Sequence, residues 1–319
     1  MTPRHDWNSE EVLGLLNSPL DSLLSHARET HLRHADQDVQ KCELLSVKTG
    51  ACPEDCGYCA QSAHYDTGLE KESLLSPISV FEAAKAAKER GANRFCIGAA
   101  WRDIPTDQRF DFVLDMIRKV ASLKMEVCCT MGMATETQLI AMKDAGLTAY
   151  NHNLDTSREH YDKVITTRTY DDRLETLAAV RKAGVQICCG AILGMGESAT
   201  DRASLIAELG SMDPHPESVP INLLVPIEGT PLEGSPAVAF EDFLRTIATT
   251  RIVMPKARVR LSAGRNELTQ EEQLACFQAG ANSIFIGEKL LTTDNVELEI
   301  DEALVNRWEE NQSTTTTSP

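Results

Sequence analysis

Short apolar runs alternate with longer amphipathic runs along most of the 319-residue chain. The short runs have the length and β-branched content of buried strands, and the long runs have the periodicity of helices. The predicted strands are residues 44–48, 94–98, 126–130, 149–153, 185–191, 218–224, 258–262 and 282–286. The predicted helices between them are residues 80–90, 110–123, 136–145, 170–183, 201–210, 240–253 and 270–278. Eight repeated strand–helix units favour an α/β fold of the (β/α)8 TIM-type barrel class, and a doubly wound sheet is the alternative.

Glycine follows several of these helices, as expected where a helix ends. No linker-like segment divides the chain, and 42% apolar content is enough for one large domain or two ordinary ones. We therefore expect a helical N-terminal extension over residues 1–37 and a barrel over residues 38–300. Residues 301–319 should form a helix end and a disordered tail, since the Thr, Ser and Pro residues after 311 have nothing to bury.

Charge and composition exclude several classes of protein. The net charge of −17 argues against a nucleic-acid partner, which needs clustered Lys and Arg. No apolar stretch near the start suits a signal sequence, and no run of about 18 apolar residues suits a membrane span. We expect a soluble, cytoplasmic protein without a membrane partner. In that reducing compartment the ten cysteines should be metal ligands or buried thiols rather than disulfides.

Three cysteines directly follow the first predicted strand, in the segment Cys52-Pro-Glu-Asp-Cys56-Gly-Tyr-Cys59. Three thiolates at this spacing can hold a metal cluster and leave one coordination position open. Structural zinc sites usually combine paired Cys-x2-Cys units and close with four ligands, and no fourth cysteine lies nearby at a matching spacing. The spacing therefore favours an iron–sulfur cluster with an open site, with zinc or a plain electron-transfer cluster as the alternatives.

Barrel geometry sorts the strand residues by parity, because alternate side chains face the lumen. Packing the apolar residues of the second, third, fifth and seventh strands outward leaves polar and thiol side chains inside. The inward set is Arg94, Cys96, Glu126, Cys128, Thr130, Gln186, Cys188, Arg258 and Arg260. Cys129 and Cys189 then become packing residues, and Cys42 falls at the far end of the barrel. Three inward thiols can hold a second metal centre with an arginine as ligand or charge partner, although each can equally be a small buried hydrophobe.

Polar residues alternate on the fourth strand, at Asn151, Asn153 and Asp155. An unpaired buried amide costs about 1–3 kcal/mol, so these side chains predict a hydrogen-bonding ligand. Asn222 in the sixth strand has the same character, and its alternative is an amide bonded to a neighbouring loop. His152 has the opposite parity, which predicts a hydrogen-bonded structural histidine.

These segments together resemble one family. The match runs through residues 48–62, 94–101, 150–157, 166–170, 217–222, 259–265, 279–285 and 289–293, and covers roughly residues 5–300. The triad with its aromatic Tyr58 resembles the radical S-adenosylmethionine (SAM) superfamily, and the wider set resembles the biotin synthase family within it.

The resemblance implies two clusters and two small molecules. It assigns a [4Fe–4S] cluster to Cys52, Cys56 and Cys59, and a [2Fe–2S] cluster to Cys96, Cys128, Cys188 and Arg260. It places SAM against Tyr58, Asn153, Asp155, Arg173, Ile192 and Val225. It places the substrate, dethiobiotin, against Asn153, Asn222, Thr292 and Thr293. No side chain is expected to act as a general acid or base, and the resemblance gives no role to Cys42, Cys129, Cys189 or Cys276.

The implied reaction inserts sulfur into dethiobiotin to form biotin, the last step of biotin biosynthesis. Reduced [4Fe–4S] cluster cleaves SAM to a 5′-deoxyadenosyl radical that removes hydrogen, and the [2Fe–2S] cluster donates sulfur. The resemblance also implies an electron donor of flavodoxin or ferredoxin type and a homodimer. Two other functions remain open from the residues: a radical SAM barrel acting on another substrate, and a non-enzymatic iron–sulfur or zinc protein.

Overall fold

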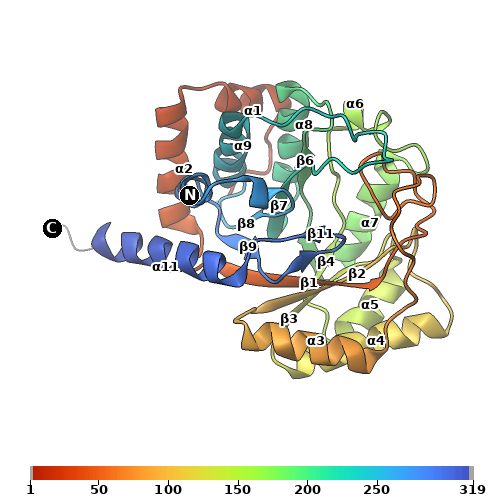
Figure 1. The fold of residues 1–319 in the computed structure, drawn as a ribbon. Helices are drawn as coiled ribbons and strands as arrows, with labels where there is room; N and C mark the ends of the chain where they lie inside the picture. Colours follow the sequence, from red (N-terminus) through yellow and green to blue (C-terminus); the bar gives the residue numbers. More distant parts are fainter. Residues whose placement is uncertain (1–2, 316–319) are drawn as a thin grey trace.

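A parallel sheet closes on itself at the centre of the computed structural model, which describes residues 3–315 (Figure 1). The strands follow the order β5-β4-β3-β2-β1-β9-β8-β7-β6, and β7 pairs with both β5 and β6. Their bounds are β1 Gln40–Lys48, β2 Arg94–Ala99, β3 Glu126–Thr130, β4 Ala149–Asn151, β5 Gln186–Cys188, β6 Ala191–Leu193, β7 Ser218–Leu223, β8 Arg258–Leu261 and β9 Ser283–Phe285. Closure confirms the (β/α)8 barrel and excludes the open, doubly wound sheet.

The fourth strand ends at Asn151, two residues earlier than predicted, and the first and fifth strands differ more. The first begins four residues earlier, at Gln40, where it pairs with β9. The fifth, predicted as residues 185–191, is split into β5 and β6 around Gly190. A Cβ atom at Gly190 would lie 1.9 Å from the Pro220 carbonyl oxygen, so the close approach of β7 requires glycine there.

Helices surround the barrel. They are α3 Pro77–Glu89, α4 Gln108–Ser122, α5 Glu136–Asp144, α6 Arg158–Tyr161, α7 Tyr170–Lys182, α8 Ala199–Gly210, α9 Phe240–Val253 and α10 Gln270–Gln278. Several begin with a capping box, in which the N-cap hydroxyl and the N3 side chain exchange hydrogen bonds with backbone N–H groups. Thr135, Thr169, Ser198 and Thr269 start α5, α7, α8 and α10 in this way. These caps fix where each helix leaves its loop at the carboxyl end of the barrel.

Both chain ends add helices to one side of the barrel (Figure 1). Helix α1 (Ser9–Leu16) packs on α8 and α9, and α2 (Leu20–His34) packs on α9. Helix α11 (Leu298–Thr315) packs through the buried Trp308 against His31 of α2 and Phe277 of α10. It continues to Thr315, although the sequence predicts a disordered tail from residue 311; the rest of that tail, residues 316–319, lies outside the described residues. Between residues 3 and 315, no helix is long and apolar enough to cross a membrane.

Candidate functional site

A cavity of about 330 Å³ occupies the carboxyl end of the barrel and continues into its lumen. Its volume suits a small-molecule site, and this end of the barrel is where such enzymes carry their active sites. Every residue that the sequence analysis proposes as a ligand or contact lines this cavity. The set is Cys52, Cys56, Tyr58, Cys59, Cys96, Cys128, Asn153, Asp155, Arg173, Cys188, Ile192, Asn222, Val225, Arg260, Thr292 and Thr293.

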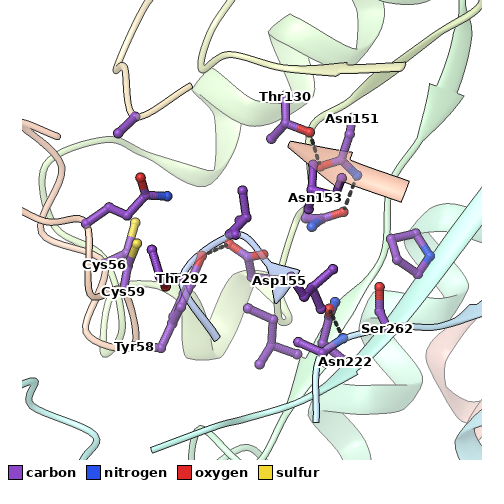
Figure 2. A pocket seen from close by; sticks show the side chains of 18 of the residues that line it. Cys56, Tyr58, Cys59, Thr130, Asn151, Asn153, Asp155, Asn222, Ser262 and Thr292 are labelled. Carbon is purple, nitrogen blue, oxygen red and sulfur yellow. Dashed lines mark hydrogen bonds between the residues drawn. The ribbon is translucent and has the colours of Figure 1, made fainter. Parts of the chain in front are cut away.

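The cysteine triad lies on the loop that follows β1, where the sulfur atoms of Cys56 and Cys59 lie close together (Figure 2). The loop turns back on itself through hydrogen bonds from Cys52 N to Gln61 O (2.9 Å) and from Cys59 N to Cys56 O (3.0 Å). Burial raises the pKa of Cys59 to about 12 and also raises the pKa of Cys52 and Cys56. Metal binding must therefore release thiol protons from this loop.

Two carboxylates hold the triad loop against the segment before α7. Asp55 accepts hydrogen bonds from the backbone N–H groups of Thr166 (2.9 Å) and Thr167 (3.1 Å). Partial burial raises the pKa of Asp55, but the hydrogen bonds from Thr166 and Thr167 outweigh this effect and lower that pKa to about 2. Glu54 is buried and forms ion pairs with Arg102 (3.1 Å) and Arg168 (3.9 Å). These contacts of Glu54 and Asp55 were not predicted from the sequence, because the partners are more than 40 residues apart in the chain.

Asp155 is held at the centre of the cavity by two side chains. Tyr58 donates its hydroxyl proton to Asp155 Oδ2 (2.8 Å; Figure 2), and Arg173 Nη2 lies 2.7 Å from the same oxygen. Arg173 is itself positioned by hydrogen bonds to the Tyr161 hydroxyl (2.7 Å) and to the Asn153 carbonyl. The backbone of Asp155 adopts a φ of 68°, which is strained for a residue with a side chain. Among residues 3–315, no group donates a hydrogen bond to the other carboxylate oxygen, Oδ1, and Asp155 lines the cavity.

A ladder of amides runs beside Asp155. Thr130 donates to Asn151 Oδ1 (3.1 Å), Asn151 donates to Asn153 Oδ1 (3.1 Å), and Gly190 N donates to the same Asn153 oxygen (3.1 Å; Figure 2). Asn151 also lies 3.3 Å from the Cys188 sulfur. The three predicted side chains all line the cavity, although Asn153 and Asp155 lie beyond the end of β4, and the amides of Asn151 and Asn153 are paired largely with neighbouring protein groups.

The side-chain amide of Asn222 also forms hydrogen bonds within the protein. Its Nδ2 donates to Ala191 O (2.8 Å), and its Oδ1 accepts from Ala263 N (3.1 Å). This is the alternative that the sequence left open, an amide bonded to neighbouring backbone. Because Asn222 lines the cavity, its second N–H and its second lone pair can still meet a ligand.

The lumenal thiols form a group of their own at the deep end of the cavity. Cys96, Cys128 and Cys188 are buried together, whereas Cys129 and Cys189 belong to the apolar core between barrel and helices. This confirms the parity assignment for the five cysteines. A hydrogen bond with Cys188 lowers the pKa of Cys128. A hydrogen bond with Cys96 and burial raise it by more, so that the net pKa lies above its usual value.

Arginines and a glutamine surround the thiol group. Arg260 Nη1 lies 3.7 Å from the Cys188 sulfur, and Arg260 Nη2 donates to Gln40 Oε1 (3.2 Å). Gln40 in turn donates to Glu126 (2.8 Å), which also accepts from Arg94 Nε (2.8 Å). Within the described part of the chain, the buried Nη1 of Arg94 has no hydrogen-bond partner. Although Arg94 is paired with Glu126, this unused N–H beside the thiols suits an anionic group in the lumen.

Two predictions about single residues, Arg258 and His152, were wrong, and the prediction for Cys42 was incomplete. Arg258 does not enter the lumen but pairs with Asp36 (2.9 Å) and Asp38 (3.0 Å) near the start of β8. Cys42 lies near the amino end of β1, as predicted, where it pairs with Arg94 at the start of β2; its membership of the lumenal thiol group was not predicted. His152 is buried, but its Nε2 has no partner among residues 3–315, and burial with the nearby Arg173 and Arg168 lowers its pKa well below 6.5.

The last elements of the site come from the segment after β9. A hairpin of β10 (Lys289–Leu290) and β11 (Thr293–Asp294) brings Thr292 and Thr293 over the cavity. Thr293 donates its hydroxyl proton to Leu290 O (3.1 Å), which fixes the turn. The two threonines were predicted from the sequence, but the hairpin that carries them was not.

The donor set suits iron–sulfur clusters in its chemistry, since buried or half-buried thiols are the ligands such clusters use. Among residues 3–315, no three His, Cys, Asp or Glu side chains are gathered closely enough to hold a single metal ion. A cluster places iron and sulfide between its thiolates, so it requires wider spacing than a single ion. The family relationship below, rather than this geometry, identifies the first cluster.

Comparisons with known proteins identify the family. A family model described as "Radical SAM superfamily" matches residues 46–209, and one described as "Biotin and Thiamin Synthesis associated domain" matches residues 220–310. Biotin synthase of Granulibacter bethesdensis is 57% identical over 308 residues, covering 96% of this chain and 98% of its own. Biotin synthase of Hahella chejuensis is 57% identical over 305 residues, covering 95% of this chain and 86% of its own.

Solved structures support the fold. The hydrogenase maturase HydG from Carboxydothermus hydrogenoformans has a TM-score of 0.80 at 18% identity, covering 94% of this chain and 75% of that one. Methylornithine synthase (PylB) has a TM-score of 0.78 at 18% identity, covering 96% of this chain and 93% of that one. From the sequence relatives, the two family models and the cavity geometry, we conclude that the chain belongs to the biotin synthase family of radical SAM enzymes.

Proposed function

We propose that the two thiol sets of this family member hold two different clusters in one cavity. Cys52, Cys56 and Cys59 hold the [4Fe–4S] cluster that the family uses with SAM, and its open position faces the cavity. Cys96, Cys128, Cys188 and Arg260 hold a [2Fe–2S] cluster in the lumen. The observation that carries the proposal is that both sets line one cavity, with the Asp155 and amide groups between them.

Donor chemistry supports each assignment. The triad supplies three ligands and leaves the fourth position for a ligand from outside the protein. The lumenal set adds the cationic groups of Arg94 and Arg260, which offset the negative charge of thiolates and sulfide. When bound, the two clusters and SAM supply the electron, the radical that removes hydrogen, and the sulfur.

The chain's own residues bind and orient the small molecules. We propose that the free Oδ1 of Asp155 and the amide of Asn153 bind the ribose of SAM. Arg173 lies next to both and provides positive charge for the methionyl carboxylate. Ile192 and Val225 give apolar contacts for the adenine beside Tyr58. Tyr58 and Arg173 hold the Asp155 side chain in place before SAM binds. SAM binding therefore costs little side-chain entropy at Asp155.

The part of the cavity wall formed by Asn153, Asn222, Thr292 and Thr293 can bind dethiobiotin. Its ureido group is neutral and can pair with the unused N–H and lone pair of Asn222 and with Asn153. Its carboxylate can be bound at the β10–β11 turn by the hydroxyl groups of Thr292 and Thr293. Most other lining side chains are apolar or thiol, which limits water around reactive carbon. The pocket would therefore bind the substrate's polar ends and leave its C–H bonds in the cavity that both thiol sets line.

The division of the chain, the redox partner and the assembly also belong to the proposal. Residues 1–37 form the extension, residues 38–300 the catalytic barrel, and residues 301–319 the C-terminal segment. The electron donor is of flavodoxin or ferredoxin type, and the enzyme is a homodimer. Size-exclusion chromatography with light scattering tests the dimer.

Anaerobic reconstitution with iron and sulfide, followed by dethiobiotin, SAM and a low-potential reductant, tests the activity. We expect biotin, methionine and 5′-deoxyadenosine. Formation of 5′-deoxyadenosine without biotin would indicate another substrate for the same barrel. Absence of both products with intact clusters would reject an enzymatic role.

A further inference from the structure

Cys42 lies among the proposed cluster ligands. It is completely buried on β1 and belongs to the same lumenal group as Cys96, Cys128 and Cys188. These four thiols come from four different strands, β1, β2, β3 and β5. The proposed [2Fe–2S] site uses three of them, so one lumenal thiol has no assigned role.

The surroundings of Cys42 are those of a polar group. Its sulfur lies 3.5 Å from Gln40 Oε1 and 3.7 Å from Ser283 Oγ. Arg260 donates to the same two residues, from Nη2 to Gln40 (3.2 Å) and from Nε to Ser283 (2.9 Å). A cysteine that merely fills space is expected in apolar surroundings. Cys42 instead shares two of the hydrogen-bond partners of the proposed arginine ligand, Gln40 and Ser283.

Strand register also brings Cys42 next to positive charge. It pairs with Arg94 across β1 and β2, and with Phe285 across β1 and β9. The guanidinium of Arg260 stacks over Phe285, 4.9 Å from the ring centre. A thiolate at Cys42 therefore lies between two buried guanidinium groups, which compensate its charge.

We propose that Cys42 is a reserve fourth ligand of the [2Fe–2S] cluster and exchanges with Arg260. This inference rests on the proposed function, because it requires the lumenal cluster. In the exchange the iron–nitrogen bond breaks and an iron–sulfur bond forms. The thiol proton of Cys42 moves to the released guanidine, which becomes a guanidinium, so atoms and charge balance.

The two ligand sets differ measurably. Arginine must lose a proton held with a pKa above about 12 to bind iron, whereas a thiolate is the usual ligand of such clusters. Replacing a neutral nitrogen ligand by a thiolate makes the cluster more negative and lowers its reduction potential. A four-thiolate cluster is therefore identified by its potential and absorption spectrum, independently of catalysis.

The test compares five proteins reconstituted anaerobically: wild type, Arg260→Leu, Cys42→Ser, Cys42→Ser/Arg260→Leu and Cys129→Ser/Arg260→Leu. Cys129 is equally buried but faces the outer core, so its double variant is the matched control. Iron and sulfide content, absorption and the midpoint potential of the second cluster are measured. The [4Fe–4S] signal and far-UV circular dichroism report folding, and Arg260→Gln replaces Arg260→Leu in every comparison should that variant not fold.

We expect Arg260→Leu and its Cys129→Ser double variant to keep the second cluster with a more negative potential. We expect Cys42→Ser to keep it at the wild-type potential, and Cys42→Ser/Arg260→Leu to lose it. Equal cluster content in Arg260→Leu and Cys42→Ser/Arg260→Leu, whether kept or lost, overturns the role of Cys42. Absence of a second cluster from the wild type is a separate result, which rejects the lumenal site itself.

Discussion

Adjacent cysteines on β3 give a sharp test of the lumenal assignment. Cys128 and Cys129 are both fully buried, yet they face opposite sides of the barrel wall. Changing either to alanine removes one buried sulfur atom, which costs about 1 kcal/mol of unfolding free energy. With an unfolding entropy of about 2.1 cal/mol/K for each of 319 residues, the apoprotein Tm falls by about 1.5 °C in both variants.

The two variants should differ only in the second cluster. We expect Cys128→Ala to lose the [2Fe–2S] absorption after reconstitution and Cys129→Ala to retain it. Differential scanning calorimetry of the apoproteins and visible spectra of the reconstituted proteins provide the two measurements. Loss of the signal in Cys129→Ala with retention in Cys128→Ala would falsify the strand register and the ligand assignment together.

Three further outcomes follow from the site. Tyr58→Phe removes a hydrogen bond to the Asp155 carboxylate, worth about 1.5–3 kcal/mol. The affinity for SAM, measured by equilibrium dialysis, should therefore fall at least about tenfold. Unchanged affinity would show that Arg173 alone positions Asp155. Arg173→Met leaves Asp155 buried without its cation, which should destabilise the apoprotein by about 3–5 kcal/mol in urea unfolding, and a loss below 1 kcal/mol would contradict the buried pair. Hydrogen bonds hold the folded pKa of Asp55 at about 2, below its unfolded value, so its stabilisation is complete above about pH 5 and disappears as the pH falls toward 2. The Tm difference between wild type and Asp55→Asn should therefore be largest above about pH 5 and should disappear as the pH falls toward 2. A Tm difference that does not depend on pH would exclude this role of the Asp55 carboxylate.

The alternation of apolar residues along the strands was sufficient to predict the barrel and most of the side chains that face its lumen. Alternation of apolar residues placed β3 at residues 126–130, as observed. The same period of two separated Cys128 from Cys129 and Cys188 from Cys189, because each strand can bury only one face against the outer helices. The candidate ligands and contacts, which all line one cavity, follow from this periodicity together with the family motifs.

Contacts fixed by barrel closure could not be predicted in this way. Gln40 meets Arg260 across 220 positions of sequence, and only the pairing of β1 with β9 and β9 with β8 brings them together. The lumenal position of Cys42 depends on the same closure. Gly190 interrupts the fifth strand because Pro220 approaches it from a different strand. Sequence periodicity describes which face a residue occupies, but not which distant residue completes its hydrogen bonds.

We propose that the lumenal cysteines hold the sulfur that is inserted into the substrate. Reconstituting the second cluster with isotopically heavy sulfide, removing free sulfide, and allowing one turnover with dethiobiotin tests it directly. We expect heavy sulfur in the biotin formed, together with loss of the [2Fe–2S] absorption. Biotin containing only light sulfur, with that absorption unchanged, would contradict it.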